Sequence, residues 1–168
     1  DFFEEENLNL LNSGREWYSK RFKLTLSGAY PFTLEGLQTN EPLKIKVSSA
    51  IRSNEISSIE IKANNKLLGE LTANSVNLSN YASTFAIAST DEFSYNPTSN
   101  IITVQVNYLQ PNSNSEAWLN YITINGRAKL QLTGDQLAFR DSRSVTFGSV
   151  SEFRVDNVSD NHVIWDIT

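Results

Sequence analysis

The sequence predicts an all-β fold, an antiparallel β-sandwich of jelly-roll type with little helix. Apolar and polar residues alternate with a period of two over much of the 168-residue chain, as in strands with one buried and one solvent-facing side. These alternating segments are short, and clusters of Asn, Ser, Pro and Gly separate them. No helical pattern that could connect parallel strands lies between them, which favours a sandwich.

The clearest strand is the segment PLKIKVSSAIR, residues 42–52. Its apolar residues Leu43, Ile45 and Val47 alternate with lysine and serine, so one side of the strand is expected to be buried. The same alternation, or a similar run of strand-forming residues, predicts further strands at 22–30, 57–64, 66–72, 101–109, 117–126, 128–134, 151–157 and 162–168.

Two local signals refine this picture. The pair Asn64-Asn65 stands between two expected strands and predicts a tight hairpin, because asparagine tolerates the positive φ angles of such turns. The segment Ser13-Gly14-Arg15-Glu16 has the spacing of a capping box. It predicts one turn of helix that presents the two following aromatic residues to the sandwich.

Length and composition predict a single domain. A chain of 168 residues that is 39% hydrophobic can bury one substantial core. We therefore expect residues 1–168 to form one β-sandwich module, with 1–21 as an N-terminal segment packed on it and 128–168 as its closing strands. The chain contains no Met and begins Asp1-Phe2, so we expect it to be a piece of a longer protein.

The charge and the missing residue types exclude several functions. The 14 basic residues are outnumbered by 19 acidic ones and are scattered along the chain, which argues against nucleic acid as a partner. No run of about eighteen apolar residues is present, so no membrane insertion is expected. The chain has no cysteine, which excludes disulfides, thiolate zinc sites and a cysteine nucleophile within these residues.

The sequence offers no catalytic residues, and no cofactor is expected. His162 is the only histidine, and no Gly-x-Ser-x-Gly motif is present. Oxygen ligands alone remain for a metal, which suits calcium. The acidic start, residues 1–7, lacks the spacing of a calcium loop and is interpreted as a solvated run of charge. A structural calcium between loops of the sandwich stays open.

Exposed aromatic residues leave one alternative function, that of an independent carbohydrate-binding or adhesive jelly-roll module. Tyr30, Phe32, Phe93 and Tyr95 are expected near strand ends or turns, where sugar-binding sandwiches stack rings on sugar faces. The competing interpretation is that these rings fill the core, which is the usual place of large aromatic side chains.

Two short stretches combine arginine with acidic or aromatic residues more densely than the rest of the chain. They are GREWY, residues 14–18, and FRDSRSV, residues 139–145. We interpret them as a docking or structural motif, because forked arginine donors beside rings and carboxylates are frequent at interfaces; buried hydrogen bonds that only stabilise the sandwich are an equal alternative. The candidate residues are Arg15, Glu16, Trp17, Tyr18, Arg140, Asp141 and Arg143.

Three ordered motifs also carry a resemblance to a known family. They are LLNSGREWY at 10–18, WLNYITINGRAKLQLTGDQLAFRDSRSV at 118–145, and SEFRVDNVSDNHVIWDIT at 151–168. Together they resemble the region just ahead of the peptidase domain in the PorU family, the gingipain-related cell-surface sortases of the type IX secretion system.

The resemblance implies a non-catalytic accessory or docking domain of a larger cysteine peptidase. Members of that family are exported to the surface of Gram-negative bacteria, associated with the outer membrane, and process the C-terminal signals of secreted cargo with a Cys-His pair. This chain lacks the cysteine, so no catalytic residue carries over. The implied partners are a downstream peptidase domain of the same chain and, further, other type IX secretion components or cargo.

Overall fold

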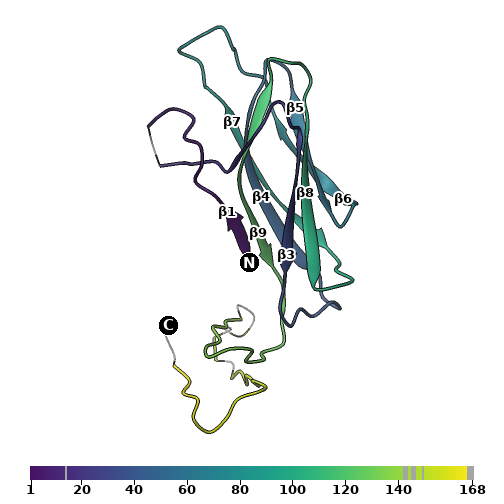
Figure 1. Ribbon diagram of the computed structural model, residues 1–168, viewed down its shortest axis with the longest axis vertical. Helices are drawn as coiled ribbons and strands as arrows, with labels where there is room; N and C mark the ends of the chain where they lie inside the picture. Colours follow the sequence, from purple (N-terminus) through teal and green to yellow (C-terminus); the bar gives the residue numbers. More distant parts are fainter. Residues whose placement is uncertain (14, 142–143, 145–146, 149, 166–168) are drawn as a thin grey trace.

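The computed structural model describes residues 1–13, 15–141, 144, 147–148 and 150–165 (Figure 1). These residues form nine β-strands and no α-helix. The strands are β1 (Phe2–Glu4), β2 (Lys20–Phe22), β3 (Ser27–Thr33), β4 (Leu43–Arg52), β5 (Ser57–Ala63), β6 (Lys66–Ala73), β7 (Ile87–Tyr95), β8 (Ile101–Leu109) and β9 (Glu116–Asn125).

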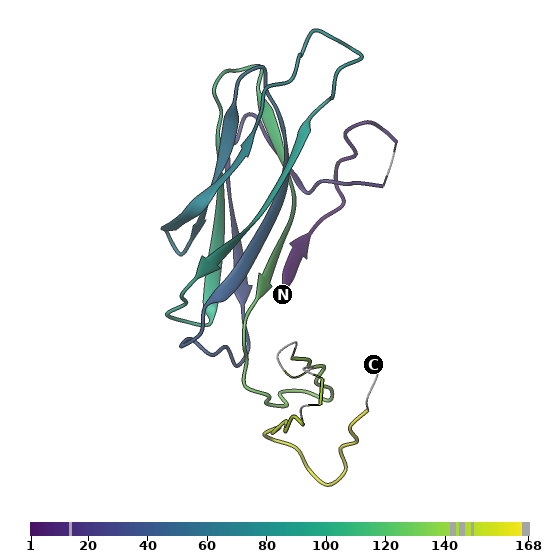
Figure 2. The same ribbon diagram turned by 180° about the vertical axis from the view of Figure 1, so that it is seen from behind.

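The strands form two antiparallel sheets that pack face to face, as the two views of the ribbon show (Figures 1 and 2). One sheet has the order β3-β8-β5-β6. In the other, β9 pairs with both β1 and β2 at one edge, and β4 and β7 follow on its other side. The orders β2-β9-β4-β7 and β3-β8-β5-β6 are those of a jelly roll. The predicted fold class is confirmed.

The alternation in the sequence places the core between the sheets. On β5, Ile59, Ile61 and Ala63 are fully buried, while the intervening Glu60 and Lys62 are half-buried on the outer side. The same pattern holds along β8 and much of β4. The inward side chains of both sheets form one hydrophobic cluster, which supplies most of the favourable free energy of folding.

The expected hairpin at Asn64-Asn65 is also confirmed. Both residues have positive φ, 46° and 69°, the conformation of a tight turn that follows the twist of the two strands. The Asn64 side chain also bridges to β8, donating to the carbonyl of Ile101 at 3.1 Å and accepting from the amide of Thr103 at 2.7 Å. The turn is therefore held against a third strand.

The prediction of one continuous strand at 22–30 is wrong. β2 ends at Phe22 and β3 begins at Ser27, and the two strands belong to different sheets. The chain crosses from one sheet to the other between them, which leaves Leu24 99% exposed. Apolar and polar residues alternate without a break from residue 22 to residue 27, so the pattern could not reveal that the chain changes sheets there.

The closing strands expected within 128–168 are not formed by the described residues. Residues 128–134 and 151–157 make two isolated bridges, Leu37 with Ala128 and Gln131 with Asp156, and 162–165 form no strand. The chain leaves the sandwich after β9, at its lower end in Figure 1, and a strand needs a continuous partner for its backbone groups. Residues 166–168 lie outside the described part.

One edge of the sandwich is built from two separate pieces of chain. Residues 121–123 of β9 pair with β1, and residues 117–119 pair with β2. Asn120 lies between them, where the pairing of β9 with β4 shifts register at a bulge. Residues 5–19, here called the N-terminal loop, are thus an insertion between two halves of one edge strand.

We expect the jelly roll to depend on buried side chains of β9. Leu119→Ala should lower the free energy of unfolding by about 2 to 5 kcal/mol, because Leu119 is fully buried between the sheets. Leu24→Ala is the matched control and should change it by less than about 0.5 kcal/mol. Urea denaturation measures both, and equal effects would contradict this packing.

Candidate functional site

The GREWY stretch lies in the N-terminal loop. Backbone hydrogen bonds between Leu8 and Tyr18, 2.8 and 2.9 Å long, close the base of the loop. The Asn7 side chain adds a bond to the carbonyl of Ser19 at 3.0 Å, and the Ser19 amide donates to Leu119 of β9 at 2.8 Å. The loop is therefore anchored to the edge of the sandwich at its base.

The capping box predicted at Ser13-Gly14-Arg15-Glu16 is wrong for the residues that are described. The amides of Leu11 and Ser13 donate to the side chain of Asn9, and the Glu16 carboxylate accepts from the Tyr18 hydroxyl at 3.1 Å. Asn9 offers the backbone a local turn that competes with a helix. Gly14 lies outside the described residues.

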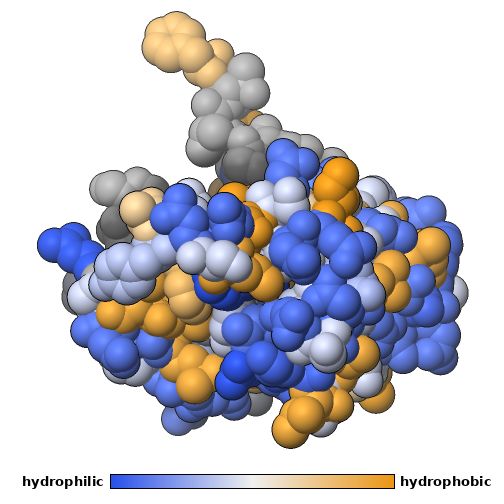
Figure 3. Space-filling model, turned by 90° about the horizontal axis from the view of Figure 1, so that it is seen from above, coloured by the Kyte–Doolittle hydropathy of each residue, from blue (hydrophilic) through white to orange (hydrophobic). Residues whose placement is uncertain are grey.

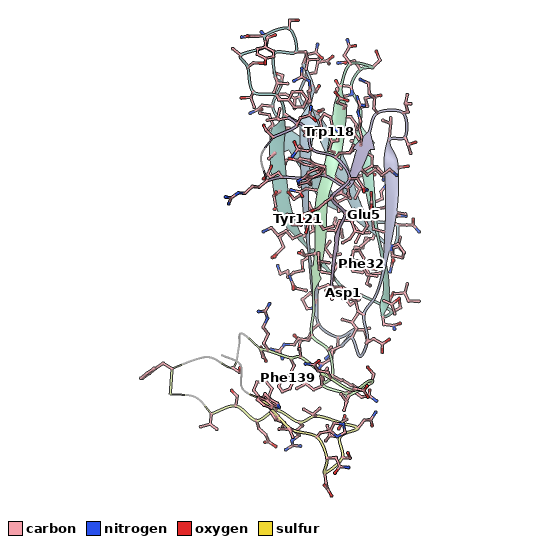
Figure 4. All side chains as sticks on the ribbon, turned by 60° about the vertical axis from the view of Figure 1, so that its left-hand side comes forward. Asp1, Glu5, Phe32, Trp118, Tyr121 and Phe139 are labelled. Atoms are coloured by element: carbon pink, nitrogen blue, oxygen red, sulfur yellow. The ribbon has the colours of Figure 1, made fainter. Side chains whose placement is uncertain are left out.

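A second, smaller hydrophobic cluster lies on the outer face of the sheet that contains β4 and β9. We call it the outer-face cluster; its buried members are Tyr18, Ala50 and Trp118, and Leu10, Phe85 and Ala86 pack against them. Figure 4 labels Trp118 on β9. The N-terminal loop and the loop between β6 and β7 thus meet over this face.

Charged side chains border the outer-face cluster. Arg52 donates to the carbonyl of Phe85 at 2.6 Å and lies 4.3 Å from the centre of its ring, a cation–π arrangement. Glu116 is 8% exposed and accepts from the Arg21 guanidinium, with Lys23 at 3.7 Å. A nearly buried carboxylate is stable in folded proteins when it is paired in this way.

The four candidate residues in the N-terminal loop differ sharply in burial. Tyr18 is 5% exposed and Trp17 is 40% exposed, while Arg15 and Glu16 are exposed. Trp17 is therefore no core residue, and Tyr18 is one. Seen from the upper end of Figure 1, the apolar residues form separate small patches among polar ones (Figure 3).

The FRDSRSV stretch lies elsewhere. Asp141 accepts two hydrogen bonds from Arg127, at 2.7 and 2.8 Å, and Arg127 also lies 3.5 Å from Glu41. Arg140 is exposed, and Arg143 lies outside the described residues. Phe139, which begins the stretch, lies below the sandwich and away from Trp118 (Figure 4). The described residues of the two motifs therefore lie in different parts of the molecule.

Burial sets the protonation of the central tyrosine. Desolvation, and then the nearby Glu16 carboxylate, raise the pKa of Tyr18 to about 12, because both disfavour a phenolate. Burial and then Glu5 likewise raise the pKa of Tyr30 to about 12. Both hydroxyls are therefore protonated and neutral at physiological pH.

The single histidine and the possible metal ligands can both be placed within the described part of the chain. The His162 ring nitrogen accepts from the Ser159 amide at 2.9 Å, and His162 is exposed. The described residues contain no group of three or more His, Cys, Asp or Glu that could hold a metal. None of their segments is a helix long and apolar enough to cross a membrane.

The rings that suggested sugar stacking belong to the core. Tyr30, Phe32, Phe93 and Tyr95 are each 8% exposed or less and join the cluster between the sheets. The core interpretation of these four rings is confirmed, so none of them offers a flat exposed face.

Comparisons with known proteins find a similar fold among solved structures but no matching sequence family. No family model and no curated protein matches the sequence. Among solved structures, PorU from Porphyromonas gingivalis, in its dimeric latent form, matches with a TM-score of 0.66 and 18% identity. The match covers 80% of this chain and 13% of the PorU chain. The likeness shows a shared fold with a part of PorU.

Two carbohydrate-binding modules are more distant matches. The module CBM36 in complex with calcium and xylotriose has a TM-score of 0.45 and 9% identity, covering 74% of this chain and 99% of its own. The CBM36-1 domain of a xylanase from the hindgut metagenome of Trinervitermes trinervoides has a TM-score of 0.45 and 10% identity, covering 68% and 90%.

Neighbouring aromatic residues should respond differently to truncation. We expect Tyr18→Ala to lower the free energy of unfolding by about 3 kcal/mol, because it removes a buried ring from the outer-face cluster and leaves a cavity there. Trp17→Ala should lower it by less than about 1 kcal/mol, since its side chain is 40% exposed. Chemical denaturation of the two variants tests this; a larger loss for Trp17→Ala would make it a core residue.

Stability should also fall at high pH. The folded pKa values of Tyr18 and Tyr30, both about 12, exceed the usual value near 10, so the folded state holds these protons more tightly. The resulting stability is complete below pH 10 and is lost as the pH rises toward 12. Denaturation curves across this range measure it. Tyr18→Phe should flatten the decline, and an unchanged slope would count against the assignment.

Proposed function

We propose that this chain is a non-catalytic accessory module of a larger cysteine peptidase, of the PorU type of type IX secretion sortase. In this role the sandwich docks against the peptidase domain that follows it in the same polypeptide. The proposal places the parent protein at the surface of a Gram-negative bacterium, associated with the outer membrane, where it processes the C-terminal signals of cargo. Its further partners in this proposal are other type IX secretion components or cargo.

The structural likeness to PorU is the observation that carries this proposal. The match extends over 80% of this chain but only 13% of PorU, as expected if the chain corresponds to one module of a much longer protein. The absence of cysteine from the sequence is consistent with a module that leaves the chemistry to another domain.

The segment below the sandwich supports a docking role. Residues 139–165 carry many apolar side chains that are unusually exposed for a folded protein. They are Phe139 (36%), Phe147 (104%), Val150 (99%), Phe153 (43%), Val158 (53%), Val163 (74%), Ile164 (81%) and Trp165 (79%). Contact with a neighbouring domain would remove this surface from water, a favourable change of about 25 cal/mol for each Å² of apolar area.

The parent protein provides the most direct test. Its polypeptide should contain a peptidase domain with a Cys-His pair, and the chain described here should cleave no peptide on its own. A fluorogenic peptide assay on the purified chain measures the second point. Peptidase activity that His162→Ala abolishes would overturn the non-catalytic assignment, and glycan binding with no peptidase domain in the parent would favour the carbohydrate-binding alternative.

Docking can be tested with the peptidase domain produced separately. We expect Trp165→Ser to weaken the association of the peptidase domain with this chain by more than about tenfold, because exposed aromatic residues often dominate interface energy. In a separate assay, Arg15→Ala and Trp17→Ala should reduce processing of cargo by the whole protein without unfolding it. Leu24→Ser is the control for Trp165→Ser, because Leu24 is also highly exposed (99%, against 79% for Trp165) but lies between β2 and β3. Titration calorimetry should show no loss for that control, and full binding by Trp165→Ser would contradict docking.

A further inference from the structure

A groove of about 510 Å³ runs between the edge strands β1 and β3, where the two sheets meet the solvent. We call it the edge groove. Figure 4 labels Asp1, Glu5 and Phe32 along this side of the sandwich. Its lining residues are Asp1, Phe2, Phe3, Glu5, Ala29, Tyr30, Pro31, Phe32 and Thr33. The volume is in the range of ligand sites.

The β3 wall of the groove presents free backbone groups. The Tyr108 amide donates to Leu26, and the Leu34 amide donates to Asn100, so the even-numbered residues of β3 bond to β8 in an antiparallel ladder. Ala29, Pro31 and Thr33 therefore direct their backbone groups away from β8, toward the open edge. Lys20 uses one such group already, bonding the Ser27 carbonyl at 3.0 Å.

The inner surface of the groove is apolar but carries one unsatisfied polar atom. Phe3 packs on Tyr30 with ring centres 4.6 Å apart, while Phe2 lies at the rim of the groove, 68% exposed on the opposite face of β1. Tyr30 is 8% exposed, yet its buried hydroxyl has no hydrogen-bond partner among the described residues.

The β1 wall of the groove is negatively charged. Asp1 and Glu5 line it. The α-ammonium of Asp1 donates to the Ile124 carbonyl at 3.0 Å, and its positive charge offsets the Asp1 carboxylate, so Glu5 supplies the net negative charge. No lysine or arginine of the described residues forms an ion pair with either carboxylate. The β3 wall opposite is uncharged, being Ala29, Pro31 and Thr33. A ligand with an inward basic group would complement this charge.

We propose that the edge groove binds an extended peptide, which pairs with β3 through its backbone and directs apolar and basic side chains inward. Free edge carbonyls and amides favour a peptide, because strand addition uses main-chain hydrogen bonds for affinity and pockets for side-chain choice. Pro31 removes one donor at the middle of the edge, which discourages unlimited sheet growth. The remaining groups of Ala29 and Thr33 still hold one short segment. The inference is independent of the proposed peptidase association.

The probe is a fluorescein-labelled peptide of sequence Val-Thr-Arg-Thr-Val with blocked ends, titrated with the purified chain and followed by anisotropy. Strand pairing places its arginine and both valines on the inward side. We expect saturable binding. The peptide with glutamate in place of arginine should bind at least about fivefold more weakly, and a version with N-methylated backbone amides should not bind, because it cannot donate to β3.

Variants of the chain locate the site. Phe2→Ser should weaken binding of the arginine peptide by about tenfold, and Glu5→Lys by at least about fivefold. Both residues are exposed, so folding should persist, which circular dichroism checks. Glu70→Lys makes the same charge change on β6, away from the groove, and should leave binding unchanged. The proposal would be overturned if the arginine peptide did not bind, or if the N-methylated peptide bound equally well. It would also be overturned if xylotriose bound more tightly than the arginine peptide, or if Glu5→Lys and Glu70→Lys weakened binding equally.

Discussion

The pairing of β9 with three other strands is the constraint on which the rest of the structure depends. β4 bonds along one side of β9, and β1 and β2 share the other side. The inward side chains of β9, among them Leu119 and Ile122, are fully buried, while its outward Trp118 forms the base of the outer-face cluster. Because side chains alternate along a strand, one segment anchors both hydrophobic clusters.

The sandwich could be predicted because its central strands follow local rules. Alternation in β4, β5, β8 and β9 marked the buried faces, and Asn64-Asn65 marked a turn. The edges were harder to predict. β7 has only Phe93 and Tyr95 buried, and β1 lies within an acidic run that reads as solvated charge. Segments such as 151–157 alternate without having a strand to pair with, a fact that depends on the tertiary structure.

The surroundings of the candidate site residues also depend on the tertiary structure, so local sequence patterns described them only in part. The density of arginine and aromatic residues singled out a stretch of the N-terminal loop, but it could not distinguish buried Tyr18 from exposed Trp17. Tyr18 packs with Ala50 and Trp118 on the outer face of the sheet, whereas the neighbouring Trp17 is 40% exposed. The edge groove had no sequence signal, because its walls come from residues 1–5 and 29–33, which the antiparallel ladders bring together from separate parts of the chain.

The insertion of the N-terminal loop between two halves of an edge strand also has an evolutionary consequence. Both ends of the loop are fixed on β9, so its length does not affect the register of any strand. The entropic cost of closing a flexible loop grows slowly, by about 0.6 kcal/mol for each doubling of its length. The exposed tip of this loop, inside the bridge between Leu8 and Tyr18, can therefore change in length and sequence while the jelly roll is kept, provided that buried Tyr18 is retained.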